Sequence, residues 1–122
     1  MTTLKKSYLR RRMTANDIHS IKQLLATQKS IVIVPHKNPD GYAIGSSLGL
    51  FHYLKKSGHK VTVIAPNDYP DFLKWMPGES SIVIYETHKE TADALIANAN
   101  IIFTLDFNAL HRTGDMEHPL AT

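Results

Sequence analysis

The pattern of apolar and polar positions along the chain predicts four short strands. Each is a run of aliphatic and β-branched residues of the kind that is buried on both faces of a parallel sheet. Polar or turn-forming residues bound every run. The four strands are expected at residues 31–34, 61–64, 82–85 and 101–105.

Helical spacing of apolar residues fills the intervals between these strands. Thr14 and Asp17 form the pattern of a capping box, and they precede apolar positions at helical spacing that end at Leu25. A second helix is expected from Ala43 to a stop at Gly58. Weaker or shorter signals predict a third long helix from residue 87 or 88 to 99, one or two helical turns at 71–76, and a turn of helix at 114–117.

Strands that alternate with helices through short connections define a fold class. The pattern predicts an α/β, three-layer Rossmann-like domain with a mainly parallel sheet of at least four strands and right-handed crossovers. The chain ends shortly after its fourth strand, where such a fold normally continues. We therefore expect a truncated domain with an exposed sheet edge, and self-association into a homo-oligomer through that edge.

Composition narrows the class of protein. A chain of 122 residues that is 43% hydrophobic and 20% charged is typical of one globular domain. It holds no apolar run near the ~20 residues of a membrane span, so no membrane partner is expected. The absence of Cys excludes disulfides, thiolate catalysis and sulfur-ligated zinc, and fits a cytoplasmic location.

The net charge of +3 comes from the N-terminal end of the chain. Without the first twelve residues, nine basic residues face eleven acidic ones. Residues 1–13 are therefore expected to be a basic extension, which either touches nucleic acid or is simply solvated, and residues 14–122 the domain itself. The basic residues of the extension are Lys5, Lys6, Arg10, Arg11 and Arg12.

Polar side chains gather where two of the strands end. His36 and Asp40 lie four residues apart in a loop bent by Pro39 and Gly41, and Asp106 follows the fourth strand, with Phe107 and Asn108 behind it. Ligand sites of parallel sheets lie beyond the carboxyl ends of the strands. An imidazole and two carboxylates that converge there suit a divalent ion such as Mn²⁺, Mg²⁺ or Zn²⁺.

A purely structural interpretation of the same loop is also open. Residues 38–41 are a strong turn sequence, and Asp40 could simply cap the following helix. Gly45, Ser46 and Ser47 either approach a phosphate or allow close packing of the helix on the sheet. The chain contains neither G-x-G-x-x-G nor a Walker loop, so the usual fingerprints of dinucleotide and nucleoside-triphosphate binding are missing.

These residues resemble a known family. The stretch H-K-N-P-D-G-Y-A-I-G-S-S-L-G-L at 36–50 is similar to the first motif, H-x-N-P-D-G-D-A-I-G-S, of the DHH phosphoesterase superfamily. L-D-F-N-A-L-H-R at 105–112 resembles the second motif, and the segments 66–70 and 72–78 also look alike. The resemblance runs from about residue 14 to residue 116 and is strongest to the bacterial bifunctional oligoribonuclease and pAp phosphatase branch.

The resemblance implies a site for one metal ion and an incomplete site for a second. His36, Asp40 and Asp106 would hold a first ion, usually Mn²⁺ with Mg²⁺ as an alternative, and Asp106 would bridge to a second. Tyr42 stands where the family has another Asp ligand. The His and Asp that complete the second site, and the substrate-binding DHHA1 domain, lie outside these residues. We therefore expect at most one ion and little or no activity from this chain alone.

The function that the resemblance implies is metal-dependent hydrolysis of phosphoesters. The expected substrates are short oligoribonucleotides, cut from the 3′ end, or nucleoside bisphosphates such as pAp. Two alternatives stay open: a non-catalytic nucleotide-binding or interaction module with the same fold, and a pyrophosphatase or exopolyphosphatase-like hydrolase.

The remaining polar and aromatic residues give weaker signals. Arg112 and Ser46 are candidates for contacts to a substrate phosphate, whereas His111 is expected in a solvated loop. Trp75 and Met76 are expected to form a lid over the sheet edge. Five histidines show no partnering pattern and are expected at the surface: His19, His52, His59, His88 and His118.

Overall fold

One parallel sheet of four strands forms the centre of the computed structural model, which describes residues 13–106 and 109–122. The basic extension expected at residues 1–12, and Phe107 and Asn108, lie outside the described residues. The strand order is β3-β2-β1-β4, and the strands are β1 (Ser30–Pro35), β2 (Lys60–Ala65), β3 (Val83–Ile84) and β4 (Ile101–Leu105). The expected fold class is confirmed.

The pairing register brings the ends of β1 and β4 together. β1 is parallel to β2 on one side and to β4 on the other, and Pro35 pairs with Leu105. From Ile31 to Pro35 the strand is buried. This position explains its uninterrupted apolar sequence, since a central parallel strand is covered on both faces.

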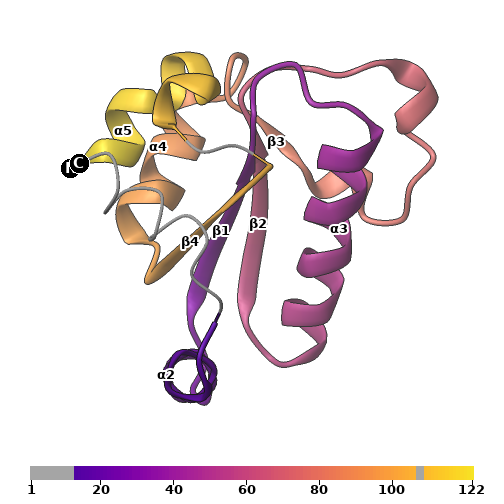
Figure 1. The fold of residues 1–122 in the computed structure, drawn as a ribbon. Coiled ribbons are helices and arrows are strands. Elements are labelled where there is room, and N and C mark those ends of the chain that lie inside the picture. The colour runs from indigo at the N-terminus through magenta and orange to yellow at the C-terminus, as the bar shows by residue number, and fades with distance from the viewer. Residues whose placement is uncertain (1–12, 107–108) are drawn as a thin grey trace, which may run out of the picture.

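Helices cover both faces of the sheet, as the sequence pattern requires. α3 (Gly41–Lys56) lies on one face, and α4 (Lys89–Asn98) and α5 (Glu117–Ala121) lie on the other (Figure 1). α2 (Ala15–Leu24) sits apart, at the end of the sheet where the strands begin (Figure 1). Among the described residues, no helix combines the length and apolar character needed to cross a membrane.

α3 is the helix that carries the candidate site at its N-terminus. Asp40 is its N-cap, and Lys55 and Lys56 lie in its last turn, where cations favour the helix dipole. The helix begins at Gly41, two residues before the predicted start at Ala43, because the cap precedes the first buried position by three residues. Its buried face packs on the sheet through Ala43, Ile44, Ser47, Leu48, Phe51 and Leu54.

α2 forms where the sequence predicts it. Thr14 and Asp17 make a reciprocal capping box, with hydrogen bonds of 3.1 and 2.9 Å. Its apolar residues do not reach the core: Ile18 and Ile21 are 45% and 41% exposed, and α2 contains no buried residue. Leu25, directly after the helix, is the residue that packs against the sheet.

Several local predictions are wrong in detail. The third strand spans only Val83–Ile84, because Ile82 ends a 3-10 turn formed by Glu79–Ser81. Of the one or two turns expected at residues 71–76, one forms, the 3-10 turn Asp71–Leu73, and it ends early because Lys74 is its C-cap. Gly114, expected inside a helical turn, has φ 60° and ψ −124° and breaks the helical segment Leu110–Met116 before α5.

Two predicted surface features are also corrected. His59 is buried, because its Nδ1 accepts a hydrogen bond of 3.1 Å from the backbone N–H of Lys29 and joins the start of β1 to the start of β2. Trp75 is 75% exposed and is therefore no lid, whereas Met76 packs against the core under the loop that follows β2.

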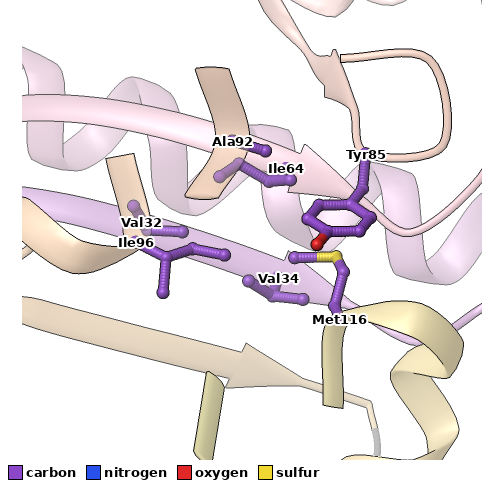
Figure 2. Packing of buried hydrophobic residues seen from close by; sticks show 7 residues of the cluster. All are labelled: Val32, Val34, Ile64, Tyr85, Ala92, Ile96 and Met116. Carbon is purple, nitrogen blue, oxygen red and sulfur yellow. The ribbon is translucent and has the colours of Figure 1, made fainter. Parts of the chain in front are cut away.

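The core on the α4 side is closed by the C-terminal segment. Met116 is fully buried and meets Tyr85 and Val34, between the sheet and α4 (Figure 2). The Tyr85 hydroxyl donates to Asp93 Oδ1 at 2.8 Å. Burial, and then this hydrogen bond, raise the pKa of Tyr85 to about 12, so the phenol remains a donor at neutral pH.

β4 is an edge strand, the position at which self-association is expected. In the strand order it has one neighbour, β1, and four of its five residues are only half-buried. Such an edge can pair with another chain. Self-association through this edge stays a prediction.

Replacing Met116 tests the docking of the C-terminal segment. Met116→Ala should lower the free energy of unfolding by about 2–5 kcal/mol, because it opens a cavity in a packed core. Met13→Ala, at a position that is 60% exposed, is the matched control and should change it by less than about 0.5 kcal/mol. Urea unfolding followed by circular dichroism measures both, and equal stabilities would contradict the packing described.

Candidate metal centre

Three side chains from separate parts of the chain meet at the carboxyl edge of the sheet. His36 follows β1, Asp106 follows β4, and Asp40 caps α3. One ligand atom from each lies within 4.8 Å of the others. Across residues 13–106 and 109–122, this is the one group of three or more His, Asp or Glu side chains close enough to share an ion.

The hydrogen bond of His36 shows which ring nitrogen is available. Its Nδ1 lies 2.7 Å from the carbonyl oxygen of Lys37, which can only accept, so Nδ1 carries the proton and donates. Nε2 then presents a lone pair toward Asp106 Oδ2, 3.4 Å away. A cation bound between the imidazole nitrogen and the carboxylate oxygen would be attracted by both atoms.

Asp40 serves the helix and the cluster together. Its Oδ1 accepts a hydrogen bond of 2.8 Å from the backbone N–H of Ala43, which is the capping role that the sequence left open. A carboxylate has four lone-pair directions over two oxygens, so one cap bond leaves others for a cation. The two interpretations of this residue are therefore compatible.

The backbone on both sides of the cluster is held in an uncommon conformation. Asn38 has φ 55° and Asp106 has φ 63°, both in the left-handed region that costs a non-glycine residue energy. Asn and Asp tolerate this region better than other residues. Strain of this kind persists only where surrounding contacts hold it in place, and it gathers at functional sites.

Two contacts that sequence reasoning missed fix the loop between β1 and α3. Asn38 and Asn67 exchange hydrogen bonds of 2.7 Å each: Asn38 N–H donates to Asn67 Oδ1, and Asn67 Nδ2 donates to Asn38 Oδ1. On the other side, Lys37 N–H donates to the carbonyl of Arg112 at 2.6 Å. The turn sequence around Asn67 was the available signal, but nothing in it names Asn38 as the partner.

The weaker candidates lie near the cluster without joining it. The Arg112 side chain is exposed, and its backbone carbonyl makes the contact with Lys37. Ser46 is exposed and its hydroxyl donates to the carbonyl of Ala43 at 3.2 Å. His111 is exposed, as expected. A role for Arg112 or Ser46 in binding substrate stays a prediction.

Position 42 offers no ligand for a second ion. Tyr42 is in the first turn of α3 and is 87% exposed. Mn²⁺ and Mg²⁺ prefer carboxylate and carbonyl oxygens to a phenol oxygen. The donor set of one imidazole and two carboxylates fits one such ion, and no second group of three such side chains is found in residues 13–106 and 109–122.

Fold and site together define an α/β protein with a His/Asp cluster at the carboxyl edge of a parallel sheet. The sequence profile described as "DHH family, N-terminal domain" matches residues 30–120, which is more than half of the chain. The chain belongs to the DHH family, as its motifs suggested.

Two relatives illustrate the similarity. The bifunctional oligoribonuclease and PAP phosphatase NrnA of Thermus thermophilus is 46% identical over 56 residues, 46% of this chain and 17% of that protein. The crystal structure of an exopolyphosphatase-related protein from Bacteroides fragilis superposes with a TM-score of 0.86 at 47% identity, over 89% of this chain and 32% of that one. The chain thus spans a third or less of the length of either relative.

The two roles of Asp40 can be separated by substitution. Asp40→Ala removes the cap and should lower the free energy of unfolding by about 0.5–2 kcal/mol. Asp40→Asn keeps a capping oxygen, so without divalent cations its stability should stay within about 0.5 kcal/mol of the parent chain. Thermal unfolding in a chelator measures both, and equal losses would show that the cap is not what Asp40 provides.

Proposed function

We propose that this chain binds one divalent cation through His36, Asp40 and Asp106 and forms the N-terminal part of a metal-dependent phosphoesterase. Mn²⁺ is the proposed ion, with Mg²⁺ as the alternative. The observation that carries the proposal is the donor set itself: three ligand atoms lie within 4.8 Å, and the His36 lone pair faces the Asp106 carboxylate.

When bound by His36, Asp40 and Asp106, a divalent cation would supply positive charge that activates a water and neutralises phosphoryl oxygens. The contribution of the chain is to hold that charge in place. His36 is oriented by the carbonyl of Lys37, and Asp40 by the first turn of α3. Ligands fixed before the ion arrives need little reorganisation, and hydrogen bonds that orient a ligand in this way raise metal affinity.

Short oligoribonucleotides and nucleoside bisphosphates are the proposed substrates. The relative that supports them is named as an oligoribonuclease and PAP phosphatase, and it is 46% identical over the matched residues. A second candidate, hydrolysis of inorganic phosphate chains, is supported by the exopolyphosphatase-related structure at 47% identity. Both classes of substrate present a phosphate to the same cluster.

Tyr42 limits the activity that we propose for the chain. Its exposed phenol supplies neither the charge nor the oxygen that an Asp would bring to a second ion. A single ion polarises one phosphate less strongly than a two-ion clamp does. We therefore propose that the chain binds one cation and hydrolyses phosphoesters only slowly.

Cation binding is tested by titrating the chain with Mn²⁺ in a calorimeter. We expect one ion per chain, and Asp106→Asn should weaken binding by at least about tenfold, which is ~1.4 kcal/mol. Tyr42→Phe is the matched control and should leave the affinity unchanged, because the exposed hydroxyl is not a ligand. Two tight sites per chain, or an affinity that Asp106→Asn does not alter, would overturn the proposal.

Turnover is tested with pAp, a short RNA and pyrophosphate, each with Mn²⁺. The chain should be at least about a hundredfold slower than a two-ion family enzyme, a difference of ~3 kcal/mol in the barrier. Any turnover should be lost in Asp106→Asn and should favour pAp or RNA. Preference for pyrophosphate would support the second candidate, and binding without turnover of any substrate would identify a binding module.

A further inference from the structure

A pocket of about 360 Å³ opens beside the cluster, on the side of the loop that follows β2. Asp40 lines this pocket and also belongs to the cluster, so the pocket adjoins the cluster. Four of its eight lining residues are apolar: Pro39, Pro70, Phe72 and Leu73. Binding sites for small organic molecules have this make-up, with apolar walls and a few polar groups.

Phe72 is an unusual part of this wall. It is 74% exposed, although the neighbouring Leu73 is buried at 5% and anchors the same 3-10 turn in the core. An aromatic ring held at the surface beside a binding site is the usual platform for stacking a base. Because Phe72 lies on a fixed turn, its backbone loses little conformational entropy when a base stacks on the ring.

The wall that carries Phe72 is braced from within. The Tyr69 hydroxyl donates to Glu79 Oε1 at 2.6 Å, and Tyr69 is buried. Burial, and then this hydrogen bond, raise the pKa of Tyr69, so the phenol remains a donor at neutral pH. Lys74 lies 3.0 Å from Asp68 and 3.6 Å from Asp71, across the base of the turn.

The polar rim of the pocket offers hydrogen-bond acceptors. Asp68 lines the pocket, and its hydrogen bond with Lys74 lowers the pKa of the carboxyl, so Asp68 is a carboxylate at neutral pH. The ion pair with Lys74 offsets much of this charge, and the remaining lone pairs of the carboxylate can accept hydrogen bonds from N–H groups. The edge of a nucleobase offers N–H donors and the ring offers an apolar face, whereas an inorganic phosphate chain offers neither.

We infer that this pocket is a nucleobase subsite: it takes the base of a nucleotide whose phosphate lies at the His36, Asp40 and Asp106 cluster, with Phe72 as the stacking surface. The inference rests on the proposed function and narrows it. It places the substrate among nucleotides and short RNA and argues against inorganic phosphate chains, which leave the apolar walls without a partner.

The test compares AMP with ribose 5-phosphate, which lacks the base, in calorimetric titrations of the Mn²⁺-loaded chain. AMP should bind at least about tenfold more tightly. Phe72→Ala should weaken AMP binding by about 5- to 100-fold, the range of one base stacked on an aromatic ring. It should leave the affinity for ribose 5-phosphate unchanged, and Phe72→Tyr should retain the affinity for AMP.

Trp75→Ala is the matched control. Trp75 is a neighbouring aromatic residue with the same exposure, 75%, but it does not line the pocket, so its removal should change neither affinity. Equal binding of AMP and ribose 5-phosphate, or equal losses in Phe72→Ala and Trp75→Ala, would overturn the inference while the cation site stands.

Adenosine without any metal separates the two proposals. Saturation-transfer NMR should detect contact between the adenine protons and the parent chain, and the signal should fall in Phe72→Ala but not in Trp75→Ala. Adenosine contact without Mn²⁺ binding would refute the proposed function and leave the pocket standing. Mn²⁺ binding with no adenosine contact would refute the pocket alone.

Discussion

The parallel pairing of β1 with β4 is the interaction on which the rest of the site depends. Pro35 and Leu105 are partners in this register, so the next residues, His36 and Asp106, leave the sheet side by side. Neither residue can reach the other through local structure, because the helices α3 and α4 and the strands β2, β3 and β4 lie between them in sequence. The hydrophobic burial of β1 between two strands and two helix layers holds the pairing in place, and the functional edge is a consequence of that burial.

Hydrogen bonds of the loop after β1 fix the geometry around His36 and Asp106. The two residues after His36 form hydrogen bonds with different segments. Lys37 bonds to Arg112 in the C-terminal part, and Asn38 bonds to Asn67 in the loop after β2. These bonds hold Asn38 in its left-handed conformation and fix one side of the cluster before any ligand binds. A site whose ligands are arranged in advance loses less conformational entropy on binding, so these contacts favour binding at a charged, partly exposed centre.

Two features of this chain carry the proposals about its site. Tyr42, in the first turn of α3, is exposed and contributes no carboxylate, which is the basis for proposing a single cation. The loop after β2 carries exposed aromatic residues over a braced interior, where Tyr69 and Glu79 share a short hydrogen bond. The second feature is the basis for proposing that the pocket beside the cluster takes an organic group.

The sequence by itself determined the fold class and the elements β1, α3 and β4 around the site, because apolar periodicity and turn chemistry are local properties. It also singled out His36, Asp40 and Asp106, which the structure brings together. It misjudged residues whose state depends on distant partners. His59 is buried because it meets Lys29, and Gly114 breaks a helical segment where it lies against the side chain of Lys37. The apolar residues of α2 have the spacing of a buried face but remain exposed, since periodicity shows that a face exists and not what covers it. Only the tertiary structure decided that Asn38 pairs with Asn67 and that Phe72 lines a pocket next to the cluster, because both depend on how two loops meet at one edge of the sheet.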